Sequence, residues 1–168
     1  AGLGKEYLEQ KKPEKGLPLI DEFVEGQRRL MGAKSLNFAG VLSLVSVDLL
    51  KAMQYVAAEK YLREARTIME NLKPRVKTHW QKTLLGEALL GQKKFAESEP
   101  LLREGWEEML GAANKVTAAN EKQVRVAGLQ RLIVLYTALE KPEEAAKWQK
   151  ELDARKSSSS PATPATEN

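Results

Sequence analysis

A repeat of about 40 residues runs through this chain of 168 residues and restricts its possible folds more than any other feature. Small residues mark the repeat at positions 16, 58, 98 and 145, at intervals of 42, 40 and 47 residues. Nine residues before each marker stands a large apolar residue: Tyr7, Leu49, Leu89 and Tyr136. Twelve residues before the markers stand Gly4, Ser46, Gly86 and Ile133, and three of these are small. This period, combined with helical spacing, is typical of stacked helix pairs that form a solenoid.

The clearest copy of the repeat lies at residues 84–102, which are predicted to form the end of one helix, a tight turn and the start of a second helix. Gly86 and Ser98 place one small residue in each helix, so we expect these two residues to face each other where the helices approach closely. Gly91 is expected to end the first helix in the left-handed conformation. Pro100 and Pro18 share a repeat position near the start of the second helix, so we interpret proline there as part of the motif.

Similar signals place the other helices. Pro13 and Glu14 fit the first turn of a helix. Gly32 is expected to end that helix. Ser35 is expected to cap a helix that runs to Ala52 and is apolar on most sides, so this helix should be enclosed by its neighbours.

The helix signals together predict one domain over residues 1–156. Its four repeats are expected at 1–32, 35–72, 75–111 and 119–156, with the first repeat incomplete. The small, polar residues 111–120 form the longest connection between repeats, which explains the interval of 47 residues. Residues 157–168 consist mainly of Ser, Pro, Thr and Ala, and we expect them to be disordered.

The register of these residues resembles the tetratricopeptide repeat in its longer form, as in kinesin light chains. The matching stretches are Leu84–Leu102, Gly105-Trp106, Leu132–Tyr136 and Lys141–Leu152. Residues 79–153 resemble the last repeats of bacterial proteins, many of them planctomycete proteins, in which such arrays often follow a serine/threonine protein kinase domain. Repeat two departs from the pattern, because Ser43-Leu44 stands where the family often has paired asparagines. The resemblance implies an all-α, right-handed superhelical solenoid of about four antiparallel helix pairs that binds other proteins.

The composition is that of an ordinary globular protein, with 42% hydrophobic and 30% charged residues. The chain has no cysteine, which excludes disulfides, thiolate metal sites and thiol catalysis. No apolar run is long enough to cross a membrane, and no signal peptide is visible. These features favour a cytoplasmic location. Because the chain opens in the middle of a repeat, we expect it to be cut from a longer protein.

Few residues suggest catalysis. No phosphate-binding loop, nucleophile elbow or dinucleotide fingerprint is present, and neither are the motifs of a kinase domain. His79 is the single histidine, and we interpret it as a surface residue at a helix start. Glu104, Glu107 and Glu108 fall at helical spacing, and we interpret them as a solvated face. We therefore predict a protein that is not an enzyme and uses no cofactor or metal.

A basic stretch between Lys73 and Lys82 contains no acidic residue. Nucleic-acid binding would require a longer basic stripe with aromatic residues, whereas Trp80 is the one aromatic residue in this stretch. We therefore predict no nucleic-acid partner. The basic residues Arg75 and Lys77 would instead steer an acidic protein partner.

Two function classes follow. The first is a scaffold that binds a peptide or helical segment of a partner on a concave face lined by the first helix of each repeat. The expected binding residues are Ser43, Val47, Leu50, Arg75, Lys77, Trp80, Thr83, Glu87, Leu90, Gln130 and Val134. Some of these residues could instead pack inside the solenoid. The second class is the C-terminal regulatory or docking region of a larger enzyme, such as a serine/threonine protein kinase. The partner and the oligomeric state are left open.

Overall fold

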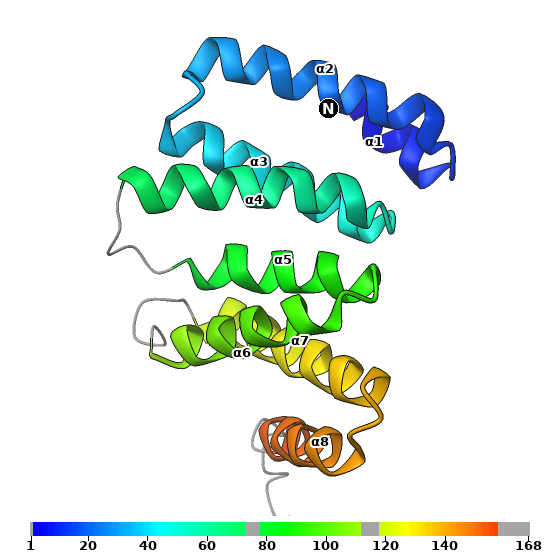
Figure 1. The fold of residues 1–168 in the computed structure, drawn as a ribbon, viewed down its shortest axis with the longest axis vertical. Helices are drawn as coiled ribbons and strands as arrows, with labels where there is room; N and C mark the ends of the chain where they lie inside the picture. Colours follow the sequence, from blue (N-terminus) through cyan, green and yellow to red (C-terminus); the bar gives the residue numbers. More distant parts are fainter. Residues whose placement is uncertain (1, 73–77, 112–117, 158–168) are drawn as a thin grey trace, which may run out of the picture. The chain divides into compact units, whose positions relative to one another are not determined.

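The protein is all-helical over the residues that its computed structural model describes, which are 2–72, 78–111 and 118–157 (Figure 1). Within these ranges eight helices and no strand are found. The helices are α1 (Gly2–Glu9), α2 (Pro13–Met31), α3 (Leu36–Lys51), α4 (Tyr55–Leu72), α5 (His79–Gly91), α6 (Phe95–Gly111), α7 (Ala118–Ala138) and α8 (Pro142–Ser157). The all-α prediction is therefore confirmed. The expected tail, apart from Ser157, and the basic residues Arg75 and Lys77 lie outside the described residues.

The chain divides into two compact units, residues 1–115 and 116–168. The first unit contains α1 to α6, and each of these helices packs against the next one along the chain. Helix α3 also contacts α5. The second unit contains α7 and α8, which pack against each other. The division falls within the longest predicted connection between repeats.

The same turn joins the two helices of every pair. Among the described residues, the non-glycine residues with positive φ are Lys11, Met53, Lys93 and Glu140, with φ between 55° and 61°. Each lies five residues before a repeat marker. Its backbone N–H bonds to the carbonyl three residues earlier, and the next N–H bonds to the carbonyl five residues before itself, as in Lys93 to Leu90 and Lys94 to Leu89. These two hydrogen bonds satisfy carbonyl groups that are free at a helix end. Because they recur in each turn, the period in the sequence is also a period in the structure.

The expected role of Gly91 was wrong. Gly91 is the last residue of α5, and the left-handed residue of this turn is Lys93. A Cβ atom on Gly91 would lie 2.5 Å from the ring of Tyr55. Gly91 is therefore required for close packing of α5 on α4, and not for the backbone conformation of the cap.

The contact between Gly86 and Ser98 is confirmed. The Ser98 Oγ donates a hydrogen bond of 2.7 Å to the Gly86 carbonyl oxygen, and the Ser98 side chain is fully buried. The corresponding residues of the first pair, Gly4 and Gly16, also bring their two helices close together. A Cβ atom on Gly16 would lie 2.8 Å from the Gly4 carbonyl oxygen. Small residues at these positions therefore allow α5 to pack on α6 and α1 on α2.

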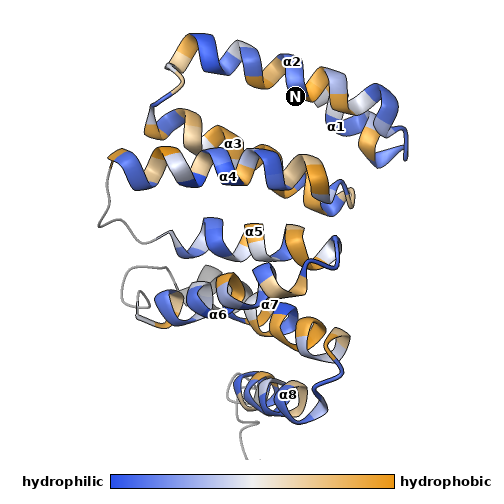
Figure 2. Cartoon of the chain, viewed as in Figure 1, coloured by the Kyte–Doolittle hydropathy of each residue, from blue (hydrophilic) through white to orange (hydrophobic). Residues whose placement is uncertain are grey.

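Helix α3 lies at the centre of the first unit and packs on α2, α4 and α5. Its start is capped as predicted, because the Ser35 Oγ accepts a hydrogen bond of 3.1 Å from the Phe38 N–H. Phe38, Leu42 and Leu49 are fully buried. The outer helices α2 and α4 alternate hydrophilic and hydrophobic stretches along their lengths (Figure 2), as expected for helices with one buried side.

Ion pairs connect the second helices of successive pairs in the first unit. From α2 to α4, Arg28 bonds to both carboxylate oxygens of Glu64, and the Lys60 Nζ lies 3.0 Å from the Asp21 Oδ1. From α4 to α6, the Arg63 Nη2 lies 2.7 Å from the Glu97 Oε2. These contacts hold neighbouring pairs in register at their partly exposed edges.

The second unit has its own buried residues, among them Leu129, Leu132 and Tyr136 on α7 and Leu152 on α8. Its turn at Glu140 repeats the hydrogen bonds of the first unit. Across the described residues of both units, no helix combines the length and apolar character needed to span a bilayer.

Candidate functional site

Helix α3 has one side that the rest of the first unit leaves open. Gly40, Leu44, Val47 and Lys51 follow helical spacing along this side. Leu44 is 63% exposed, whereas Val47 is half-buried. A Cβ atom on Gly40 would meet no atom within 4 Å. Gly40 therefore leaves open space on the same side of α3 as the exposed Leu44.

Helix α5 adds a tryptophan to this surface. The buried Gln81 side chain on α5 donates a hydrogen bond of 3.3 Å to the Ser43 Oγ on α3. Trp80 and Leu44 are the sequence neighbours of these two bonded residues, and Trp80 is 38% exposed. Leu44 on α3 and Trp80 on α5 are therefore each one residue away from the contact between Ser43 and Gln81. We call the surface formed by Gly40, Leu44, Val47 and Trp80 the α3–α5 face.

Two of the residues expected to bind a partner are buried, which corrects the expectation for them. Ser43 is fully buried, and its Oγ donates to the Ala39 carbonyl oxygen at 2.9 Å. Leu50 is 7% exposed and belongs to the core. Both face the neighbouring helices, so their side chains do not reach the surface.

The other expected residues are spread over several environments. Thr83 is half-buried and lies beside α6. Its Oγ1 is 2.6 Å from the position that a Cβ atom on Gly105 would take. Glu87 and Leu90 are half-buried on α5. Gln130 and Val134 are exposed on α7 in the second unit.

Sequence reasoning missed Leu44 as a surface residue because α3 is apolar on most sides. Hydrophobic periodicity identifies a surface only where polar residues mark it. On α3 the polar residues Ser43 and Ser46 are buried instead of exposed, so they do not mark the surface. Each can be buried because its hydroxyl donates a hydrogen bond to the carbonyl four residues earlier. The unusually small Gly40 is the residue that could have indicated the open side.

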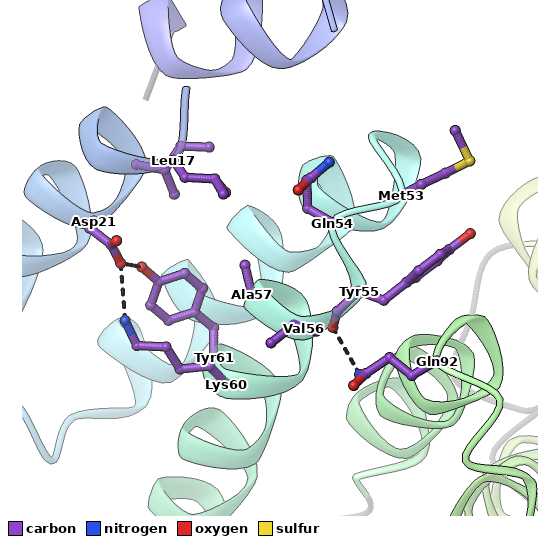
Figure 3. A pocket seen from close by; sticks show the side chains of 11 residues that line it. Leu17, Asp21, Met53, Gln54, Tyr55, Val56, Ala57, Lys60, Tyr61 and Gln92 are labelled. Atoms are coloured by element: carbon purple, nitrogen blue, oxygen red, sulfur yellow. Dashed lines mark hydrogen bonds and ion pairs between the residues drawn. The ribbon is translucent and has the colours of Figure 1, made fainter. Parts of the chain in front are cut away.

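The first unit also has a cleft of about 410 Å³ at the edge where its turns lie (Figure 3). We call it the first cleft. It opens between α2 and α4, and Gln92, after α5, contributes to its lining. The apolar part of the lining comes mainly from Leu17, Met53, Tyr55, Val56 and Ala57.

Asp21, Lys60 and Tyr61 form a polar end of the first cleft. The Lys60 Nζ and the Tyr61 hydroxyl both donate to the Asp21 Oδ1 (Figure 3). Burial would raise the pKa of Asp21, but the hydrogen bonds from Tyr61 and Lys60 outweigh burial and lower that pKa. Burial and the same hydrogen bond raise the pKa of Tyr61. Near neutral pH the carboxylate stays charged and the phenol stays protonated, so neither group is suited to proton transfer there.

A second cleft, of about 420 Å³, lies on the other side of the turn between α3 and α4. It shares Met53 and Gln54 with the first cleft. Its charged lining consists of Lys5, Glu9, Lys11, Asp48 and Lys51. The Lys5 Nζ pairs with the Asp48 Oδ1 at 3.1 Å, and this pairing raises the pKa of Lys5.

The described residues contain no group of three His, Asp or Glu side chains placed to hold a metal ion. No protein-family model matches the chain, and no curated protein shows significant similarity to it. The α3–α5 face and the two clefts are therefore evaluated by their own geometry and chemistry.

Proposed function

We propose that this chain is a non-catalytic protein-interaction module. Its helix pairs would form a right-handed solenoid of the tetratricopeptide type, and the α3–α5 face would lie on the concave side and bind an apolar segment of a partner protein. The same turn in all four pairs, with a close helix contact at the same repeat positions in the first and third, supports the solenoid, because pairs of similar geometry stack regularly.

The exposed apolar residues of the α3–α5 face are the observation that supports binding most strongly. Leu44 and Trp80 leave apolar surface in water, although burying a leucine fully would contribute about 1.5–3 kcal/mol. Tryptophan is also enriched among the residues that dominate interface energies. The open space at Gly40 would leave room for an apolar side chain of the partner beside Leu44.

The test places a large side chain at Gly40, where the fold leaves room for it. Gly40→Arg places a long side chain where the structure has open space, and it replaces glycine inside a helix, which favours folding. Gly26→Arg is the matched control, because Gly26 lies inside α2 and a Cβ atom there also meets nothing within 4 Å. The probe is a phage-displayed library of random 16-residue peptides selected on the unaltered chain.

We expect one group of the selected peptides to bind the Gly26→Arg chain normally and to lose at least about 10-fold in affinity on Gly40→Arg, because blocked apolar contacts cost about 1 to 2 kcal/mol or more. Trp80→Ala should weaken the binding of the same peptides by about 2 kcal/mol, while the helix content measured by circular dichroism stays unchanged. If every selected peptide bound both arginine variants equally, a site on the α3–α5 face would be contradicted.

A further inference from the structure

The turn of the second helix pair departs from the repeat at two positions. The left-handed turn residue is charged in three pairs, as Lys11, Lys93 and Glu140, but it is Met53 in the second pair. Two residues before the repeat markers stand Glu14, Ala96 and Glu143, whereas the second pair has Val56. Met53 is 67% exposed and Val56 is 71% exposed. The second pair therefore presents two large apolar side chains where the other pairs present charged or small ones.

The fold itself does not require these apolar residues. Lysine adopts the same left-handed conformation at Lys11 and Lys93 with the same hydrogen bonds. Glutamate in the first turn of a helix is favoured by the helix dipole, as at Glu14 in α2. Met53 and Val56 thus leave apolar surface in water with no gain to the turn, which is the pattern expected of a binding surface.

The two residues lie at the border of the clefts. Met53 lines both clefts, and Val56 lines the first cleft together with Leu17 and Tyr55. Figure 3 shows these side chains around the opening, with Asp21 and Lys60 at its polar end. Clefts of this size with a mainly apolar lining suit an apolar side chain of a ligand.

The second cleft has the charge that an acidic group would complement. Its lining carries three lysines, Lys5, Lys11 and Lys51, against two acidic residues, Glu9 and Asp48, and Lys5 is already paired with Asp48. Lys11 and Lys51 are exposed, and neither makes an ion pair with another residue in the described part of the chain. An acidic side chain placed in this cleft would therefore meet two lysines that pair with no carboxylate among the residues that the structure describes.

We propose that the turn of the second helix pair is a second binding site, for an extended segment of a partner protein that places an apolar side chain in the first cleft and an acidic side chain in the second. Met53 would contact the segment between the two anchors, because both clefts share it. This site is separate from the α3–α5 face, and its existence does not depend on the function proposed for that face.

The test gives the second turn the residues of the first turn. Met53→Lys and Val56→Glu, made together, reproduce Lys11 and Glu14, so the turn keeps residue types that already fold at these repeat positions. The probe is a phage-displayed library of random linear 12-residue peptides, selected on the unaltered chain and then measured individually by fluorescence polarisation.

We expect the selection to enrich peptides that combine Asp or Glu with Leu, Ile, Met or Phe a few residues away. Their affinity should fall at least about 10-fold on the Met53→Lys, Val56→Glu chain, because the apolar contacts are lost. On a Lys11→Glu, Lys51→Glu chain the affinity should fall by a similar factor, and peptides with the acidic residue changed to Lys should recover it. Lys93→Glu, at the equivalent turn of the third pair, is the control and should leave binding unchanged.

Three results would overturn the proposal: no enrichment of such peptides, undiminished binding to the Met53→Lys, Val56→Glu chain, or no recovery by the charge-reversed peptides. Gly40→Arg separates the two sites. Peptides for the turn should bind the Gly40→Arg chain normally, so loss of binding there would assign them to the α3–α5 face instead.

Discussion

The first and third helix pairs close at the same repeat positions, but different atoms limit the approach of their helices. In the first pair a Cβ atom on Gly16 would lie 2.8 Å from the carbonyl oxygen of Gly4. In the third pair a Cβ atom on Gly86 would lie 2.7 Å from the Leu102 side chain, and the nearest backbone atom would be 3.3 Å away. Ser98 in the third pair also adds a hydrogen bond that Gly16 cannot form.

This difference shows that one repeat position can have unequal tolerance to substitution in two copies. A backbone oxygen moves only if the whole helix moves, whereas a leucine side chain can change its rotamer. The first pair should therefore resist added atoms more strongly than the third pair. Four predictions test or extend this comparison.

The largest expected effect is that of Gly86→Leu. Four carbon atoms would enter a space in which even the Cβ atom is too close to Leu102. We expect a loss of about 3 kcal/mol in unfolding free energy from overpacking, which exceeds the gain of about 1 kcal/mol from removing a helix glycine. Urea denaturation measures this loss, with Gly26→Leu in open space as the control. An unchanged midpoint would mean that α5 and α6 are not closely packed here.

The comparison itself is tested by alanine. Gly16→Ala should cost about 2 kcal/mol, because its Cβ atom would be forced against the Gly4 carbonyl oxygen. Gly86→Ala should cost about 1 kcal/mol or less, because Leu102 can partly move away. Both values come from the same denaturation experiment. The reverse order would show that side-chain packing, and not the backbone, limits the approach.

The close contacts between the two helices of a pair are the part of the fold that the sequence predicts best. They depend on small residues, turn residues and apolar residues at fixed separations, and all of these are local and repeated. Gly86 and Ser98 could be paired for that reason. Gly91 was misinterpreted because a glycine can serve either a backbone conformation or a close approach, and only the neighbouring Tyr55 decides between the two.

The candidate sites could be predicted less well. The open side of α3 is not distinguishable by periodicity, since the helix is apolar nearly all round. The clefts depend on how α2 and α4 pack, which no single repeat reveals. One signal was nevertheless present in the sequence: Met53 and Val56 are apolar at repeat positions where the first and fourth pairs are charged.

Ion pairs connect neighbouring helix pairs as well as the two helices of the third pair, where Lys82 lies between Glu104 and Glu108. Glu59 on α4 accepts hydrogen bonds from Arg63, Lys94 and Gln92 at 2.7, 2.9 and 2.7 Å. Burial alone would raise the pKa of Glu59, but the hydrogen bonds from Lys94, Arg63 and Gln92 lower it from 4.5 to about 2. Glu59 therefore links α4 of the second pair to the turn between α5 and α6 of the third pair.

We expect Glu59→Gln to cost about 1 kcal/mol near neutral pH, since the partly exposed Lys94 and Arg63 are screened by water. A lowered pKa in the folded state contributes stability above pH 4.5, and this contribution is lost as the pH falls toward 2. The difference between the two proteins in urea denaturation should therefore shrink between about pH 7 and about pH 3. The exposed Glu22→Gln is the control. A difference that stays constant with pH would contradict the linkage.

The smallest expected effect concerns the two glycines that no close contact requires. Gly40 and Gly26 lie inside helices, and a Cβ atom on either meets nothing within 4 Å. Alanine should therefore stabilise the protein by about 0.5 to 1 kcal/mol at each position, because it reduces the entropy of the unfolded chain. Thermal denaturation measures this as a rise in Tm. Destabilisation by Gly40→Ala alone would show that the space beside Gly40 on the α3–α5 face is occupied within the folded protein, so that it could not receive a partner.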